Sequence, residues 1–138
     1  DADNLYITCK VKDGELYSGG QGTQKGSGVF IYLDTKNECL KEPAEGVYKV
    51  WCSYKGDITV WQGNKGKWEN SELEGLQITP SVVSGGYELA FTIPLNRSFN
   101  KDAMRLCATL STKTYTETLV HSNADRSCTW MKMNLGGH

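Results

Sequence analysis

Tryptophan is the residue type in this chain whose placement most directly suggests a chemistry, because two of the four tryptophans flank one short turn. Trp51 and Trp61 lie in the stretch GVYKVWCSYKGDITVWQG, in which apolar and polar residues alternate. Such alternation predicts two strands, each with one buried and one solvent-facing side. A flat indole on the solvent side can cover the C–H face of a pyranose ring with a large contact area. The stretch therefore suggests a sugar-binding surface.

The length of the turn decides on which side of the hairpin each tryptophan lies. A three-residue turn at 55–57 pairs Trp51 with Trp61 and Cys52 with Val60, so the tryptophans share one face and the aliphatic residues the other. A two-residue turn instead pairs Trp51 with Val60 and moves one tryptophan into the core. We predict the three-residue turn, although glycine is the more usual residue at its third position.

Polar side chains near the two tryptophans could bind sugar hydroxyls, and Trp68 follows a glycine-containing turn that could bring it alongside as a third wall. The predicted binding set consists of Trp51, Trp61, Trp68, Gln62, Asn64 and Lys49, whereas Trp130 is assigned to the core. Lys49 and Lys67 would also suit an acidic glycan such as pectin. The competing interpretation is that the tryptophans only stabilise strand pairing or close one end of the fold.

The elements that must position these residues are short strands separated by Gly, Asn, Asp and Pro. NLYITCKV and GYELAFTIP alternate, GVFIYLD is apolar on both sides like a central strand, and MRLCATL and TWMKMNL supply later strands, with LQITPSVV and TYTETLV as weaker candidates. We predict an all-β fold, an antiparallel, jelly-roll-like β-sandwich of about eight or nine strands. Residues 1–135 are expected to form one domain, with 136–138 as a tail or linker.

Composition excludes several classes of function. The chain has 138 residues and a net charge of −1, and its Lys and Arg residues are scattered, so neither nucleic acid nor an anionic membrane is an expected partner. No apolar run approaches the roughly 18 residues of a membrane-spanning helix. Because the chain begins at Asp1 without a methionine or a signal peptide, we expect a processed or excised module.

The five cysteines match no zinc, redox or haem-attachment spacing. We expect most of them to be free thiols. Cys39 and Cys128 lie in polar loops and are the favoured pair if a disulfide forms.

Catalytic motifs are absent from the sequence. A glycosidase needs two carboxylates across a cleft, whereas Glu69, Glu72 and Glu74 cluster in WENSELEG as in an ordinary solvated loop. There is no G-x-S-x-G elbow, and the glycine-rich segment 18–28 precedes no helix that could complete a phosphate site. The chain is therefore not expected to be an enzyme.

Three segments have a familiar order and spacing. DADNLYITCKVKD is similar to an opening strand, SGVFIYLD to a central strand that ends in aspartate, and GYELAFTIPL to a late strand that ends in Ile-Pro. Together, over roughly residues 1–110, they resemble family 9 carbohydrate-binding modules and the wider DOMON-like group, and CTWMKMNL fits the closing strand. The resemblance implies a β-sandwich that is appended to secreted polysaccharide-degrading enzymes and binds sugars without catalysis.

The resemblance also implies candidate metal and haem ligands. Some members carry structural calcium, and Asp13 and Asp34 match the motif aspartates of the family. Some DOMON-like domains bind haem through Met and His or Lys, for which the candidates here are Met104, Met131, Met133 and His121. The family's first strands are missing upstream of Asp1. The tryptophan that often precedes the central strand is also absent, so the family's tryptophan clamp does not carry over to named residues.

The sequence thus predicts a non-catalytic carbohydrate-binding module of a secreted or extracellular glycan-active protein. Its expected partner is a polysaccharide or oligosaccharide, with the plant cell wall as its setting, and we expect it to be appended to other domains. The alternatives are a structural or adhesive β-sandwich without a ligand and a haem-binding DOMON-like domain. No cofactor is predicted with certainty, and structural calcium is the one candidate.

Overall fold

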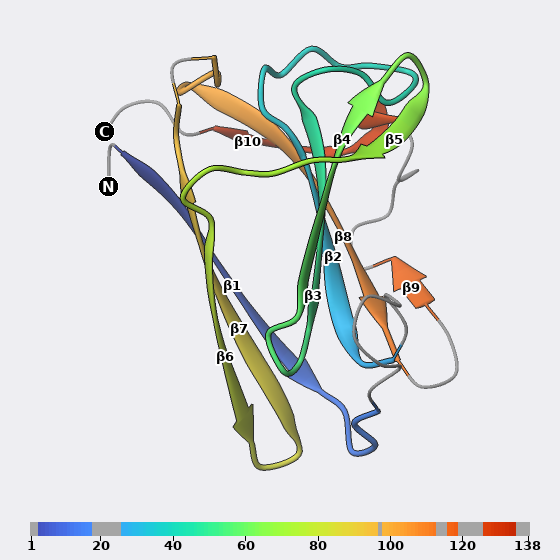
Figure 1. Ribbon diagram of the computed structural model, residues 1–138, viewed down its shortest axis with the longest axis vertical. Coiled ribbons are helices and arrows are strands. Elements are labelled where there is room, and N and C mark those ends of the chain that lie inside the picture. The colour runs from blue at the N-terminus through green and yellow to red at the C-terminus, as the bar shows by residue number, and fades with distance from the viewer. Residues whose placement is uncertain (1–2, 18–25, 97, 113–115, 119–125, 135–138) are drawn as a thin grey trace.

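The computed structural model describes residues 3–17, 26–96, 98–112, 116–118 and 126–134, and these form two antiparallel β-sheets packed face to face (Figure 1). One sheet has the order β1-β7-β6, with β1 Asn4–Lys12, β7 Gly86–Pro94 and β6 Gln77–Val83. The other has the order β10-β8-β2-β3-β4-β5, with β10 Met131–Asn134, β8 Ala103–Ser111, β2 Gly28–Asp34, β3 Val47–Ser53, β4 Ile58–Asn64 and β5 Lys67–Asn70. β9, Thr116–Thr118, pairs with β8.

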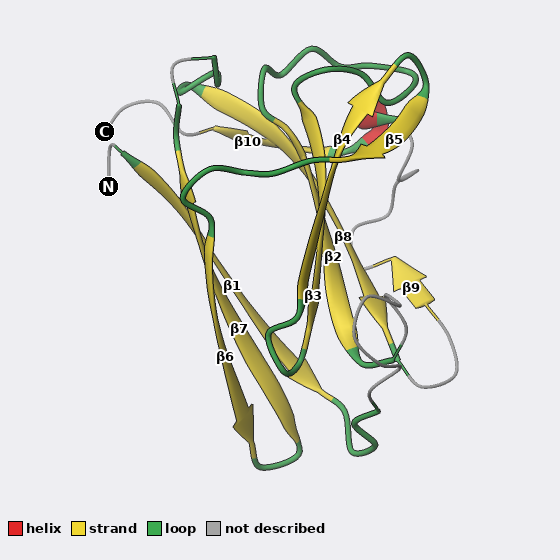
Figure 2. Ribbon diagram, viewed as in Figure 1, coloured by secondary structure: helices red, strands yellow, loops and turns green. Residues whose placement is uncertain are grey.

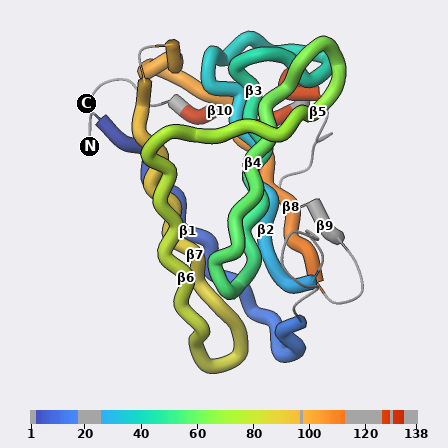
Figure 3. Tube along the Cα trace, viewed as in Figure 1, coloured from blue at the N-terminus to red at the C-terminus, as the bar shows by residue number. Residues whose placement is uncertain are grey.

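The predicted all-β antiparallel sandwich is confirmed, with ten strands among the described residues. The one helical element there is a 3-10 turn, η1 Ser127–Thr129 (Figure 2). No helix in the described part of the chain is long and apolar enough to cross a membrane. Residues 71–76 carry the chain from β5 in the larger sheet to β6 in the smaller one (Figure 3).

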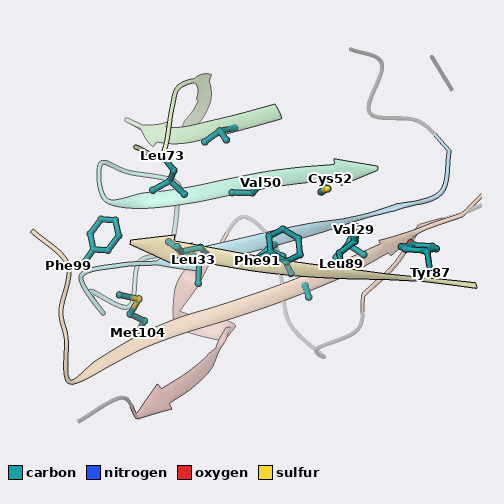
Figure 4. Packing of buried hydrophobic residues seen from close by; sticks show 14 residues of the cluster. Val29, Leu33, Val50, Cys52, Leu73, Tyr87, Leu89, Phe91, Phe99 and Met104 are labelled. Atoms are coloured by element: carbon teal, nitrogen blue, oxygen red, sulfur yellow. The ribbon is translucent and has the colours of Figure 1, made fainter. Parts of the chain in front are cut away.

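Alternation in β7 builds the smaller sheet's half of the core, as the sequence predicts. Tyr87, Leu89, Phe91 and Ile93 are all at most 1% exposed, whereas the residues between them face away from the core. They meet Val29, Ile31 and Leu33 of β2, together with Val50 and Met104 (Figure 4). A period of two along each strand is what delivers these side chains to one layer between the sheets.

β2 is buried on both faces, which also confirms the prediction of a central strand. Its other face packs into a second cluster outside the sandwich core. The buried members of that cluster are Tyr32, Val47, Cys107 and Trp130, with Phe30, Leu40 and Trp68 packed against them. The larger sheet therefore carries an apolar layer on each of its faces.

The turn between β3 and β4 differs from the predicted one. Ser53 N donates to Asp57 O at 2.9 Å and Gly56 N donates to Ser53 O at 2.9 Å, so the three loop residues are 54–56. Gly56 has φ +97°, a conformation that L side chains rarely adopt. Glycine thus occupies the third loop position, which is its usual place in such a hairpin.

This turn makes the predicted pairing of Trp51 with Trp61 wrong. Trp51 lies opposite Thr59, and Trp61 lies opposite Lys49. The register differs from the predicted one by two residues, and an even shift leaves every side chain on its predicted face. Trp51 and Trp61 therefore still lie on the same side of the sheet, but diagonally.

We predict that Gly56→Ala destabilises the protein by about 1–3 kcal/mol, because alanine resists a positive φ. The added Cβ would also lie 3.0 Å from Pro80 Cγ. Urea unfolding measures the change. Gly14→Ala is the matched control, since a Cβ added there would meet no atom within 4 Å, and it should stay within about 0.5 kcal/mol of wild type. Equal stability of the two variants would contradict the assigned turn.

The core also predicts a loss of stability at alkaline pH. Burial, with smaller contributions from Asp57 and Cys9, raises the pKa of the Cys52 thiol from 9.0 to about 12. The unfolded chain therefore loses this proton from about pH 9 while the native state keeps it, so the free energy of unfolding falls as pH rises from 9 toward 12. Unfolding titrations should show a slope approaching about 1.4 kcal/mol per pH unit. Cys52→Ala should reduce the slope between pH 9 and 10, where the partly buried Cys9 thiol, whose pKa is also raised, still contributes, and an unchanged slope in that variant would contradict the assignment.

Candidate functional site

An aromatic layer covers the outer face of the larger sheet. The register sets Phe30 opposite Trp51, and Tyr32 opposite Lys49. Trp61 on β4 lies opposite Lys49, and Trp68 on β5 lies opposite Gly63 of β4. We call this surface the aromatic face; its rings are Phe30, Tyr32, Trp51, Trp61, Trp68 and Trp130.

The rings of the aromatic face contact one another in a continuous series. The ring centroid of Phe30 lies 4.8 Å from that of Trp51 and 6.2 Å from that of Trp61. The Tyr32 ring lies 6.0 Å from Trp68 and 5.8 Å from Trp130. These tilted contacts are in the range that aromatic pairs favour. The face is thus one connected aromatic surface that runs across β2, β3, β4 and β5.

The aromatic face has a buried layer and a partly exposed layer. Trp51 and Trp130 are each 3% exposed and Tyr32 is 6% exposed, whereas Phe30, Trp61 and Trp68 are partly exposed. The expectation that Trp51 is a solvent-facing platform is therefore wrong, while the predicted burial of Trp130 is confirmed, although it lies in the outer cluster.

Gly28 explains why Trp51 is buried. A Cβ atom at Gly28 would lie 2.4 Å from Trp51 Cη2, so the indole lies directly over the glycine of the neighbouring strand. Phe30 covers another side of the same indole. Trp51 is therefore covered and packs against Phe30 of the aromatic face. Trp61 and Trp68 are the tryptophans of this face that a ligand could reach.

Lys49 lies at the centre of the aromatic face. Its Nζ is 4.8 Å from the ring centroid of Trp61, 5.1 Å from Phe30, 5.8 Å from Trp68 and 5.9 Å from Tyr32. A lysine ammonium within about 6 Å of an aromatic ring is attracted by the negative face of the ring. The predicted site residue Lys49 is thus brought together with Trp61 and Trp68, at the point where four rings meet.

Gln62 and Asn64 are not brought to the aromatic face. Side chains alternate along a strand, so Gln62 points to the side opposite Trp61. Its Nε2 donates to Tyr48 Oη at 3.2 Å, and Asn64 Nδ2 donates to Glu69 Oε1 at 2.8 Å. Their predicted part in binding stays a prediction, on a different surface from the tryptophans.

Phe30 and Tyr32 are site residues that the sequence reasoning missed. Both belong to GVFIYLD, whose apolar pattern predicts only a strand buried on two sides. Two aromatic residues at i and i+2 of a central strand were an available signal, because that spacing puts both on one face.

The two aspartates proposed as calcium ligands accept hydrogen bonds from the protein. Asp34 is fully buried and accepts from Glu38 N, Cys39 N and Ser127 Oγ at 3.2, 3.0 and 2.9 Å. The carboxylate of Asp13 accepts from Glu15 N and Ser27 Oγ. Within the described residues no group of three or more His, Cys, Asp and Glu could hold a metal ion. Both carboxylates are thus engaged by protein donors, and their part in binding calcium stays a prediction.

The remaining candidates are dispersed. Met104 is fully buried in the sandwich core and Met133 packs against that core, while Met131 is 48% exposed. His121, their proposed partner in a haem site, lies outside the described residues. The three acidic residues of WENSELEG are exposed, although Glu69 lies on β5 and not in the predicted loop. All five cysteines are free, with Cys39 exposed.

Ser127 connects distant parts of the chain at one end of the aromatic face. Its Oγ accepts from Leu40 N at 2.6 Å and donates to Asp34, and its carbonyl accepts from Trp130 N at 3.0 Å. This hydroxyl therefore links the loop after β2 to the segment that carries Trp130.

We predict that Ser127→Ala lowers the free energy of unfolding by about 2–3 kcal/mol, because a buried carboxylate and an amide each lose a partner. The control Ser98→Ala removes an exposed hydroxyl and should change stability by less than about 0.5 kcal/mol.

Millimolar calcium should leave the thermal midpoint of wild type unchanged, since Asp34 is engaged by protein donors. A calcium-dependent rise in that midpoint would contradict this assignment of Asp34.

Comparisons with known proteins give one result. No protein-family model matches the chain, and neither does any curated protein sequence. Two solved structures of a family 9 carbohydrate-binding module from Caldicellulosiruptor kristjanssonii, one in complex with cellotriose and one with glucose, each superpose with a TM-score of 0.79 at 16% sequence identity. All of this chain is covered, against 72% and 73% of the two matched chains. The resemblance drawn from the sequence motifs is thus confirmed at the level of fold: the chain shares the β-sandwich of these modules.

Proposed function

We propose that the chain is a non-catalytic carbohydrate-binding module that stacks a sugar ring on its aromatic face. The observation that carries the proposal is the pairing of a buried aromatic layer with partly exposed rings above it. Buried rings such as Trp51 hold Phe30 in place. The exposed rings then form a rigid surface that a sugar can cover with little loss of conformational entropy.

The chemistry of the aromatic face suits a sugar. Trp61, Trp68 and Phe30 offer apolar area for the C–H bonds of a pyranose, and Lys49 adds N–H donors for its oxygens. Contiguous apolar surface of this kind on a protein commonly marks an interaction site. The sandwich fold shared with modules that were solved with cellotriose and glucose supports the same interpretation.

The wider context follows from this function. A module that binds polysaccharide without catalysis acts by holding a partner near its substrate, so we propose that it is secreted or extracellular and is appended to a glycan-active protein. Plant cell-wall polysaccharide is the proposed ligand class. The competing function is a structural sandwich whose aromatic face serves stability alone.

Trp61→Ala should weaken glycan binding at least about tenfold, equivalent to about 1.4 kcal/mol, because it removes the partly exposed indole next to Lys49. Affinity electrophoresis on a panel of polysaccharides, together with isothermal titration on oligosaccharides, measures the loss. Tyr6→Ala is the matched control: Tyr6 is 54% exposed on the smaller sheet, and its loss should leave binding unchanged.

Stability and binding are measured on the same samples. Trp61→Phe keeps an aromatic ring and should retain part of the affinity, which separates loss of the platform from loss of the fold. A Trp61→Ala protein that unfolds cooperatively and still binds at wild-type affinity would contradict the proposed site. A wild-type protein that binds no glycan on the panel would contradict the function itself.

A further inference from the structure

Among the described residues of the larger sheet, Lys49 is the one basic residue whose charged group is surrounded by several aromatic rings. It pairs with Tyr32 on β2 and with Trp61 on β4, so it occupies the middle of a cross-strand row. Its side chain is only partly exposed. Rings around the ammonium exclude part of its water, and a charge in such surroundings interacts more strongly with an opposite charge than it would on an open surface.

The outward-facing positions of the larger sheet's strands carry accessible charge of one sign. Among the described strand residues that face outward with the aromatic rings, the basic ones are Lys49, Arg105 and Lys132. The one acidic residue in those positions is Asp34, which is fully buried and accepts three hydrogen bonds. The accessible charge that these strand positions contribute is therefore positive.

The smaller sheet provides a contrast within the same molecule. On its outward side Lys10 lies opposite Glu88, with Nζ and Oε1 4.0 Å apart, and Lys12 shares that side, so charges of both signs occur there. Accessible strand charge of one sign beside partly exposed aromatic rings is thus a feature of the aromatic face that the smaller sheet does not share. Surfaces of one sign attract ligands of the opposite sign and reject those of the same sign.

We infer that the aromatic face selects an acidic glycan, in which a sugar ring stacks against Trp61 while its negative group binds the ammonium of Lys49. The inference rests on the proposed function, since it names the ligand class of the same site. The negative group is a uronate carboxylate or a sulfate ester, both of which accept charge-assisted hydrogen bonds from an ammonium. Nζ of Lys49 lies 4.8 Å from the Trp61 centroid, so a ring that reaches the indole brings its substituents beside the ammonium.

The test compares glycans that differ in charge. Polygalacturonate is paired with its methyl ester, and dextran sulfate is paired with dextran, so each pair isolates one kind of negative group. Isothermal titration at low ionic strength should show the wild type binding the charged member of at least one pair about tenfold or more tightly than the uncharged member. The pair that shows the difference identifies the group, and added salt should reduce the difference.

Three variants assign the selectivity to Lys49. Lys49→Met keeps the length and apolar contacts of the side chain without its charge, and should abolish the preference for the charged glycan. Lys55→Met is the matched control, because it removes the same charge from a lysine on the β3–β4 turn, whose Nζ lies 5.8 Å from the ring centroid of Tyr54. This variant should keep the preference. Lys49→Arg should also keep it, which provides a second measurement if Lys49→Met does not fold.

The outcomes separate the inference from the function beneath it. Equal affinity for charged and uncharged members, lost in Trp61→Ala, would overturn the inference and leave sugar binding intact. A preference that survives in Lys49→Met, or one that Lys55→Met abolishes equally, would also overturn it. Failure to bind any of these glycans or cellotriose would overturn both.

Discussion

The central strand β2 must be covered on both of its faces, and the arrangement of the sheets around it follows from that requirement. Val29, Ile31 and Leu33 face the smaller sheet, where they meet the buried residues of β7 (Figure 4). Phe30 and Tyr32 point the other way and need partners outside the sandwich. Because apolar side chains exposed in such a row would be costly, tryptophans from other segments gather over them.

That requirement also places the rings of the aromatic face in mutual contact. A tryptophan at the edge of a sheet is free to change rotamer, whereas these indoles are fixed by contacts to β2. Trp51 fills the space that the missing side chain of Gly28 leaves open, and Trp130 is held by the hydrogen bond between its backbone and Ser127. A rigid platform loses little entropy when a ligand binds, and this preorganisation favours affinity. The part of the surface that serves stability thus prepares the part that remains accessible.

Local patterns were sufficient to predict most of the strands and the shared face of Trp51 and Trp61, because both depend on alternation within one segment, whereas β5 and the outer position of Trp130 were missed. The turn at Gly56 could have been placed correctly, since glycine at the third loop position was the more usual choice. The burial of Trp51 could not have been predicted in the same way, because it depends on Gly28 across a strand pair. The environment of Asp34 was equally inaccessible, since its partner Ser127 lies 93 residues away in the sequence.

Lys49 brings the stability and the selectivity of the aromatic face into competition. Its ammonium already lies close to the rings of Trp61 and Phe30, and each such contact contributes about 0.5–2 kcal/mol. A neutral sugar that stacks on the same rings must share them with the ammonium and gives it only hydroxyl oxygens in return. An acidic sugar offers the ammonium a full negative charge at the moment when the ring contacts are shared. The difference in binding free energy between the neutral and the acidic sugar, and not the aromatic area alone, therefore decides which glycan this surface retains.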